Sequence, residues 1–219
     1  MRGKGATLGL RERRIREREN RRSAILSAAR KLFFEKGFRP VTVDSIAKRA
    51  ELSKGSIYLH FDSKEEIYAQ ILLQDIEQFH AGALKVRKQG GTASEMILKL
   101  SDTYVDFFLN DKELFRILMT FMVRLDRMNL SDEIGEHLIR TTNASIAVIE
   151  DILRYGIDSG EYPPDLDIRN TRNAIWGLFN GIISLYFFTG KEAKREERIR
   201  STVRTSIEIL IRGLKNGRG

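Results

Sequence analysis

The chain has 219 residues, of which 42% are hydrophobic, so it is long enough to bury a substantial core in one or two domains. It contains no cysteine, which excludes disulfides and thiolate metal sites, and no apolar run approaches the ~20 residues of a membrane span. The net charge of +8 is unevenly placed: residues 1–64 hold 17 Lys and Arg against 7 Asp and Glu, and the remainder is nearly neutral. A basic excess confined to the first third of the chain predicts a polyanion-binding surface there.

The first segment, residues 1–19, is basic and nearly devoid of an apolar face. Between Arg11 and Arg22 arginine alternates with glutamate, and Ile15 is the single apolar residue. This pattern fits either a flexible, solvated arm or a helical extension with ion pairs, and we assign a flexible basic arm. Because the segment lacks the apolar stretch of a secretory signal, we expect a cytoplasmic protein.

Three helices are expected in the next part of the chain. The first runs from about Arg21 to Lys36, because apolar residues recur there at three- and four-residue spacing. Two very short helices follow, Val43–Ala50 capped by Thr42 and Lys54–His60 capped by Ser53. Neither would be stable alone, so we expect them to share an apolar underside. Their outer edge is basic and rich in hydroxyl groups, as in a DNA-binding helix-turn-helix.

The remaining sequence also predicts helices, and no pattern of strands is present. These helices are expected over residues 63–88, 92–110, 112–124, 131–160, 167–189 and 195–214. Capping boxes at Ser63–Glu66 and Thr92–Glu95 mark two of the starts. The expected fold class is therefore all-α, with about nine helices: an N-terminal three-helix head that contains the helix-turn-helix, and a larger C-terminal helical domain.

One stretch of the sequence, from Asn20 to Tyr68, has a specific combination of residue types and spacings. The segments that carry it are Ala28–Phe33, Gly37-Phe38, Thr42-Val43, Ile46-Ala47, Ala50, Leu52–Gly55, Ile57–Phe61 and Ser63–Glu66. In these segments the chain resembles the tetracycline-repressor (TetR/AcrR) family of bacterial transcription regulators. The resemblance implies a DNA-binding domain over residues 20–66 and an effector-binding and dimerisation domain over residues 67–219. Glu51 departs from the glycine frequent at this turn, and a left-handed backbone there would cost ~1–2 kcal/mol.

The resemblance implies that the head binds double-stranded DNA and places the second short helix in the major groove. Thr42 is positioned both to cap its own helix and to bind a phosphate, and Gly55 lets the backbone approach the DNA closely. For Tyr58 and Leu59 the alternative is an ordinary, partly buried packing role. The predicted DNA contacts are Thr42, Val43, Ser53, Lys54, Gly55, Ser56, Tyr58, Leu59, His60 and Lys64.

The middle of the chain carries a cluster of aromatic and sulfur-containing residues. Such a cluster is equally consistent with ordinary core and with the lining of a pocket. The resemblance implies a pocket for a small, hydrophobic effector between these helices. The predicted lining residues are Tyr104, Phe107, Phe108, Phe115, Met119, Met122, Asn143, Trp176 and Asn180.

The last two predicted helices have more apolar surface than one subunit can cover. We therefore expect a homodimer in which these helices pair as a four-helix bundle. Its predicted interface consists of Ile175, Phe179, Ile182, Ile183, Tyr186, Ile199, Val203, Ile207 and Leu210. A dimer would present two recognition helices about one helical turn of DNA apart, ~34 Å, to a palindrome.

Catalytic chemistry is not indicated by the sequence. The three histidines lie far apart, and neither a Walker loop nor a Gly-x-Ser-x-Gly elbow is present, so we expect no enzyme activity, metal or cofactor. The expected function is a DNA-binding transcriptional regulator, a repressor that binds a palindromic operator as a dimer and is released by an apolar ligand. The alternatives are a helical carrier of lipophilic molecules and an effector-independent DNA-binding protein.

Overall fold

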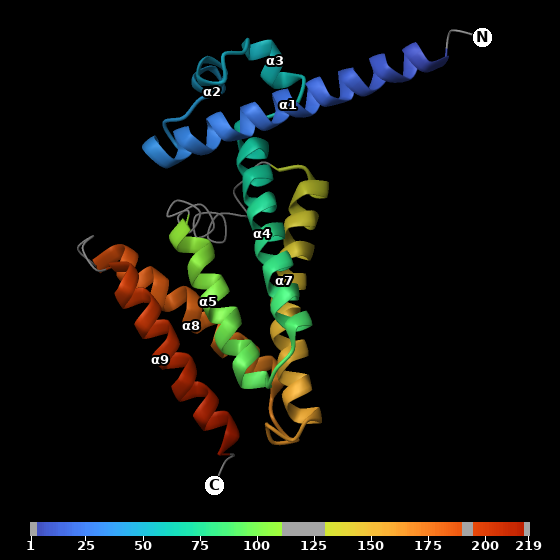
Figure 1. The fold of residues 1–219 in the computed structure, drawn as a ribbon. Helices are drawn as coiled ribbons and strands as arrows, with labels where there is room; N and C mark the ends of the chain where they lie inside the picture. Colours follow the sequence, from blue (N-terminus) through green and yellow to red (C-terminus); the bar gives the residue numbers. More distant parts are fainter. Residues whose placement is uncertain (1–3, 111–129, 190–194, 217–219) are drawn as a thin grey trace. The chain divides into compact units, whose positions relative to one another are not determined.

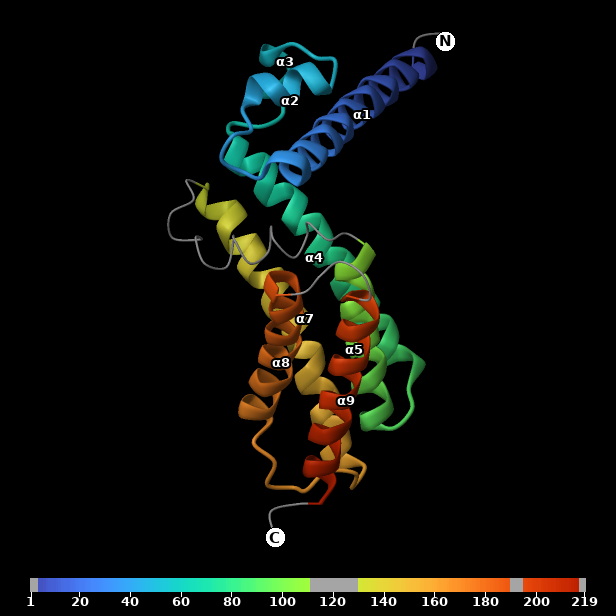
Figure 2. The ribbon, with the colours of Figure 1, turned by 90° about the vertical axis from the view of Figure 1, so that its left-hand side faces the viewer.

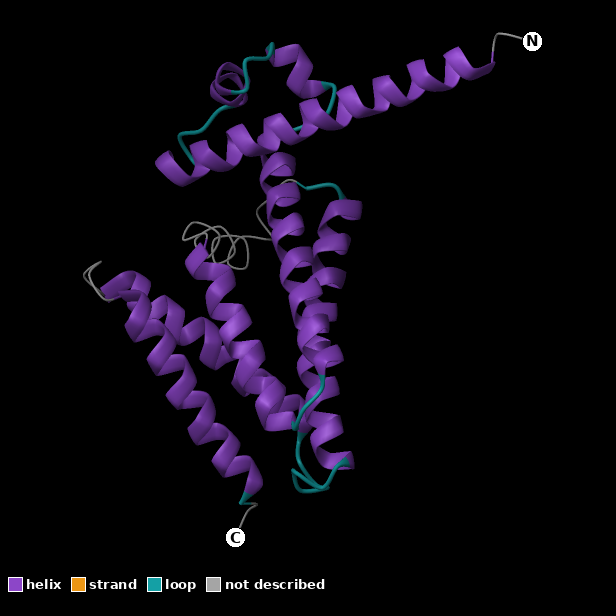
Figure 3. Cartoon of the chain, viewed as in Figure 1, coloured by secondary structure: helices purple, strands orange, loops and turns teal. Residues whose placement is uncertain are grey.

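The structure is a computed structural model that describes residues 4–110, 130–189 and 195–216. These residues form helices and contain no strand, which confirms the all-α fold class (Figure 1, Figure 3). The helices are α1 Lys4–Lys36, α2 Val43–Arg49, α3 Lys54–Tyr58, α4 Lys64–Gln89, α5 Ala93–Asn110, α7 Asp132–Asp158, α8 Ile168–Thr189 and α9 Arg195–Lys215. The helix expected over residues 112–124 lies outside the described residues. Among the helices described, none combines the length and the apolar character needed to cross a membrane.

Helix α1 corrects the prediction for the N-terminus. It is a single helix of 33 residues, so the chain is helical from Lys4 onward where a flexible arm had been assigned to residues 1–19. The alternative, a helical extension with ion pairs, is the arrangement observed: Arg13 Nε lies 3.3 Å from Glu17 Oε1, one turn farther along. Arginine and glutamate both favour helix, which explains why the segment is helical without an apolar face.

The described chain divides into two compact units. The first contains α1, α2, α3, the beginning of α4 as far as Leu73, and the beginning of α7 as far as Glu136. In its core, Ile25 of α1, Ile46 of α2 and Ile57 of α3 have no exposed surface, and Phe61 after α3 is 2% exposed. The two short helices are therefore stabilised by burial against α1 rather than by their own length, as the sequence predicts.

The second unit contains the rest of α4 together with α5, most of α7, α8 and α9. Here α9 packs against both α5 and α8. Ile199, Val203 and Ile207 of α9 recur every fourth residue and are at most 1% exposed. They form the buried stripe of an amphipathic helix.

Burial within one chain corrects most of the predicted dimer interface. Six of the nine residues are at most 1% exposed: Ile175, Phe179, Ile183, Ile199, Val203 and Ile207. These side chains belong to the core of the subunit and have no surface to offer a partner. The prediction was wrong because a regular apolar stripe looks the same in sequence whether it packs within a subunit or between subunits. The other three, Ile182, Tyr186 and Leu210, are partly exposed.

Candidate nucleic-acid interface

Helix α2 begins with a reciprocal cap. Thr42 Oγ1 accepts a hydrogen bond from the Ser45 N–H at 3.1 Å, and Ser45 Oγ accepts one from the Thr42 N–H at 3.0 Å. The cap satisfies two backbone donors in a helix of only seven residues, which confirms the predicted capping role of Thr42. Because a hydroxyl can accept and donate at once, Thr42 can hold this cap and still donate to a phosphate.

The turn between α2 and α3 is built around Glu51. Its φ of 57° is left-handed, the conformation that the resemblance implied at this position. The Leu52 N–H donates to Ala47 O at 3.0 Å and the Glu51 N–H to Lys48 O at 3.3 Å. This pair of bonds defines a Schellman cap, so the geometry of the turn is retained although the residue is not glycine.

The recognition helix α3 ends at Tyr58, two residues earlier than expected. Ser53 Oγ accepts from the Ser56 N–H at 3.1 Å, which confirms Ser53 as its cap. Lys54 Nζ lies 2.9 Å from Asp44 Oδ2, and this hydrogen bond raises the pKa of Lys54. The lysine is therefore held in its charged form beside the start of α2. Since exposed ion pairs are weak, Lys54 can exchange the carboxylate for a phosphate at little cost.

Two large side chains project from the C-terminal end of α3. Tyr58 is 48% exposed and Leu59 is 74% exposed, whereas the adjacent Ile57 is fully buried. The buried residue anchors the helix, and its neighbours are left facing solvent. This exposure favours the predicted groove contacts over the packing alternative for Tyr58 and Leu59.

His60, just after the recognition helix, is influenced by the charges of arginines in α1. Burial, followed by the positive charges of Arg18, Arg21 and Arg22, lowers the pKa of His60. His60 is therefore neutral at neutral pH and can contact DNA through hydrogen bonds rather than through charge. No sequence signal places these arginines next to the end of α3, because their proximity depends on the course of α1.

Lys64 and Arg49 make contacts within the head. Lys64 Nζ donates to Phe38 O at 3.1 Å and lies 4.2 Å from the centroid of the Phe38 ring. Arg49 makes two bonds to the Glu35 carboxylate, at 2.6 and 2.7 Å, and so connects α2 with α1. Lys64 thus fixes the loop after α1, and its phosphate contact stays a prediction.

Several of the predicted effector-pocket residues meet around Tyr104 in the second unit. The Tyr104 ring packs against Phe108, Phe179 and Trp176, with centroids 4.7, 5.0 and 5.3 Å away. The Tyr104 hydroxyl donates to Asn180 Oδ1 at 2.6 Å. Burial raises the pKa of Tyr104, so the hydroxyl keeps its proton. The result is one polar pair inside an aromatic cluster from α5 and α8.

The other predicted lining residues fall into three groups. Phe107 is half-buried and contacts Phe79 at a centroid distance of 5.7 Å, so it extends the aromatic cluster. Asn143 is exposed, about 200° around α7 from the buried Ser145, and the prediction that it faces an interior pocket was wrong. The third group, Phe115, Met119 and Met122, lies outside the described residues.

An apolar face of α8 and α9 remains open in the single chain. On α8, Ala174, Gly177, Gly181 and Leu185 follow at three- or four-residue spacing and are all exposed. A Cβ atom added to Gly177 or Gly181 would have no other group of the chain within 4 Å. On α9, Ile209 is 60% exposed. Along α8 this face lacks charged side chains, so within the described residues it is a surface that a partner helix could cover.

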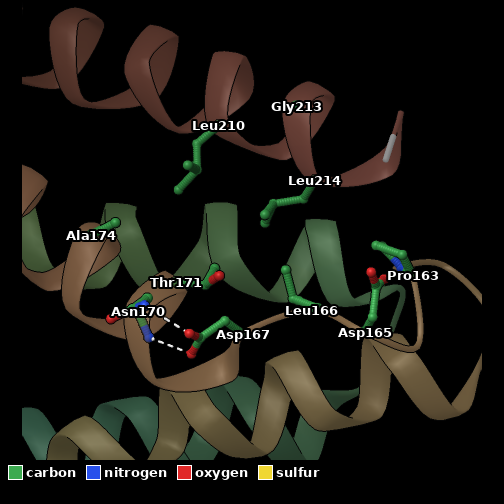
Figure 4. A pocket seen from close by; sticks show the side chains of 10 residues that line it. All are labelled: Pro163, Asp165, Leu166, Asp167, Asn170, Thr171, Ala174, Leu210, Gly213 and Leu214. Carbon is green, nitrogen blue, oxygen red and sulfur yellow. Dashed lines mark hydrogen bonds between the residues drawn. The ribbon is translucent and has the colours of Figure 1, made fainter. Parts of the chain in front are cut away.

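A groove of about 550 Å³ adjoins this open face, between the start of α8 and the end of α9 (Figure 4). Leu210 and Leu214 line it from α9, and Ala174 lines it from α8. Asp167 at its edge is engaged in capping, since it accepts bonds from the backbone and side-chain nitrogens of Asn170 at 3.0 and 2.6 Å. None of the predicted effector-pocket residues lines this groove. Within the part of the chain that the structure describes, no acidic and histidine residues gather into a metal site.

Comparison with known proteins identifies the class of this molecule. Residues 25–71 match the family model for bacterial regulatory proteins of the tetR family. Over 192 residues the chain is 27% identical to the fatty acid metabolism regulator protein of Bacillus subtilis (strain 168), covering 88% of this chain and 94% of that protein. It is 42% identical over 62 residues to the transcriptional regulator UidR of Escherichia coli (strain K12), covering 28% of this chain and 32% of that protein.

Solved structures have the same fold. PfmR, a TetR family transcriptional regulator from Thermus thermophilus, superimposes with a TM-score of 0.71 at 25% identity, over 87% of this chain and 98% of that chain. FadR from Bacillus subtilis, in complex with stearoyl-CoA, gives 0.70 at 23% identity, over 86% and 97%. The helix-turn-helix head and these matches define a DNA-binding transcriptional regulator. The head, residues 25–71, matches the TetR family of bacterial regulatory proteins, and most of the chain is similar in fold to a TetR family transcriptional regulator.

Proposed function

We propose that this protein is a repressor that binds a palindromic operator in the cytoplasm and leaves it when a hydrophobic small molecule binds. The exposed edge of α3 is the observation that supports the proposal most directly. Lys54, Tyr58 and Leu59 face solvent there, while Ile57 fixes the helix in the core of the head. In a homodimer, two such edges about 34 Å apart match successive major grooves on one face of DNA.

The proposed contacts divide into two kinds. Thr42, Lys54 and Lys64 supply phosphate contacts, because they lie at helix starts, where backbone N–H groups add to a positive field. Tyr58 and Leu59 are proposed to face the bases, and a leucine side chain suits the thymine methyl group. Phosphate contacts set the position of the head, and the base contacts provide sequence preference.

The proposed effector is a long-chain acyl thioester. The aromatic cluster around Tyr104 would give an acyl chain an apolar surface, and the Tyr104–Asn180 pair would give it one polar anchor. A relative that aligns with most of the chain regulates fatty acid metabolism, and the FadR structure contains stearoyl-CoA. These comparisons favour an acyl thioester over other hydrophobic molecules.

The proposed switch is a shift between two populations of the dimer. Helix α4 begins at Lys64 in the first unit and ends at Gln89 in the second, so one helix contributes residues to both. A ligand that prefers one position of α4 would favour the corresponding position of the head. The distance between the two α3 helices would then no longer match the operator.

Selection of genomic fragments with the purified full-length protein tests this function. The protein should recover an inverted repeat, bind it with a steep dependence on salt, and release it when stearoyl-CoA is added. Recovery of random DNA would overturn the regulator proposal, and acyl binding without sequence preference would indicate a carrier. Operator binding that stearoyl-CoA does not change would overturn the acyl effector alone.

A further inference from the structure

The N-terminal part of α1 carries arginines on one continuous face. Arg11, Arg14, Arg18 and Arg22 follow at three- or four-residue intervals, which places them in one row along the helix. The next position of the same row is Ile25, which is fully buried in the core of the head. The face that packs into the head in the second half of α1 is therefore an arginine face in the first half. We call Arg11, Arg14 and Arg18 the arginine stripe.

Arg22, the next arginine of the row after the arginine stripe, lies near the end of the recognition helix. Arg22 lies 5.2 Å from the centroid of the Phe61 ring and donates to Gln70 Oε1 at 2.7 Å, which fixes this end of the row. Burial and the charges of nearby arginines, Arg18 among them, lower the pKa of His60, two residues after α3. Figure 1 and Figure 2 show α2 and α3 on one side of α1, with the N-terminal end of α1 running beyond them.

The charges of the arginine stripe are available to a partner. All three side chains are exposed, and in the described part of the chain no carboxylate pairs with them. Arg13, on the opposite face, differs because it pairs with Glu17 at 3.3 Å. From Arg22 to Arg11 the helix rises about 16 Å at ~1.5 Å per residue. That distance corresponds to about five base pairs of DNA at ~3.4 Å each.

We propose that the arginine stripe is a second DNA-binding surface, which contacts phosphates of the duplex that flanks each half-site. The proposal rests on the operator binding proposed above and extends it outward by about five base pairs on each side. The helix already orders the backbone that carries the arginine stripe, so little backbone freedom is lost on binding. Contacts of this kind strengthen and position the complex without adding sequence preference.

Two double variants with the same change in charge test the proposal. Arg14→Gln/Arg18→Gln removes charge from the arginine stripe, and Arg13→Gln/Arg16→Gln removes the same charge from the opposite face. The probe is an operator duplex recovered by the genomic selection. The stripe variant should bind it about tenfold more weakly, with a salt slope smaller by up to about 3.6, because a dimer loses four contacts at ~0.9 each. The opposite-face variant should change both quantities much less, since it alters only the long-range field.

Trimming the duplex by about five base pairs at each end gives an independent readout. When the duplex is trimmed, the wild-type protein should lose about as much affinity as the stripe variant loses on the full duplex. The stripe variant should lose little further affinity on trimming, because its flanking contacts are already gone. If the two double variants lost the same operator affinity, or if trimming did not affect the wild-type protein, the proposed role of the arginine stripe would be overturned. The proposal of operator binding would be unaffected.

Two further outcomes also decide the matter. If the wild-type protein selects no operator, the proposed function fails and the arginine stripe fails with it. If sedimentation shows that Arg14→Gln/Arg18→Gln alters subunit association, the surface belongs to a protein contact and the proposal is overturned. Circular dichroism should show unchanged helix content in both variants, because glutamine favours helix nearly as well as arginine.

Discussion

At the scale of single residues, Gly55 separates the stability of the head from its affinity for DNA. A Cβ at this position would have Ser53 Oγ, 3.9 Å away, as its nearest neighbour, which is ordinary van der Waals contact. The chain itself therefore has room for a side chain at Gly55. Glycine is nevertheless about 1 kcal/mol less favourable than alanine within a helix. A partner that approaches the start of α3 closely would explain glycine at this position, and DNA is the partner that the proposed function supplies.

The variant Gly55→Ala is expected to keep or increase the thermal stability of the protein and to weaken operator binding about tenfold or more. The added methyl group would stabilise α3 but would occupy the space into which the sugar-phosphate chain must come. Thermal unfolding and a mobility shift on the same preparation measure the two effects. Unchanged operator affinity would show that DNA does not approach this backbone closely.

At the scale of elements, local features were predictable from sequence and partner choice was not. The caps at Thr42, Ser53 and Thr92 were predicted correctly, because a cap depends on residues within one turn of the helix start. The buried side of α9 was also evident from its spacing. The sequence did not show which surface covers this side of α9. Val203 is buried inside the subunit, where we had expected a dimer contact. The prediction for Phe179 was wrong for the same reason: the spacing of apolar residues indicates that a helix face is buried but not which chain covers it.

The correction of the interface gives a prediction for α8. Leu185→Glu is expected to weaken dimerisation at least about tenfold. It places a charge on the open apolar face of α8, and a dimer that covers this face would have to bury that charge. Ile183→Glu should instead unfold the subunit, since Ile183 is 1% exposed. Sedimentation at several concentrations, with circular dichroism, distinguishes dissociation from unfolding. Ile139→Glu on α7, where the native side chain is 48% exposed, is the matched control and should change neither.

Glu161 connects three elements of the second unit and gives it a dependence on pH. Its carboxylate accepts from the Ala93 N–H at 2.6 Å, at the start of α5, and lies 3.0 Å from Lys215 Nζ of α9. Burial alone would raise the pKa of Glu161, but the hydrogen bonds from Ser94, Lys215 and Ala93 outweigh it and lower the pKa. The contribution of Glu161 to stability is therefore present above its unfolded pKa of about 4.3 and is lost as pH falls through the folded value.

Glu161→Gln is expected to lower the free energy of unfolding at neutral pH by about 1.5–3 kcal/mol, the usual range for hydrogen bonds to a charged group. The difference from the wild-type protein should shrink as the pH falls through the lowered pKa of the folded state, where the native carboxyl also becomes neutral. Denaturant titrations at several pH values measure it. Glu197→Gln, an exposed carboxylate in the first turn of α9, should show little difference at any pH. A Glu161 effect that is constant with pH would contradict the lowered pKa.

At the scale of the whole molecule, the proposed switch requires the effector and the operator to oppose each other equally. If stearoyl-CoA weakens operator binding by a given factor, the operator must weaken stearoyl-CoA binding by the same factor, because both describe one thermodynamic cycle. A factor of roughly 5–150 is typical of such coupling.

Titration of stearoyl-CoA into the free protein and into the operator complex measures how far the operator weakens stearoyl-CoA binding. Titration of operator with and without stearoyl-CoA measures how far stearoyl-CoA weakens operator binding. Coenzyme A without an acyl chain is the matched control and should release little operator, because it lacks the apolar chain that the cluster around Tyr104 is proposed to hold. Unequal factors would show that the release of DNA does not come from equilibrium binding of stearoyl-CoA to the regulator, because any binding to the protein, including competition for the basic surface of the head, obeys the same cycle.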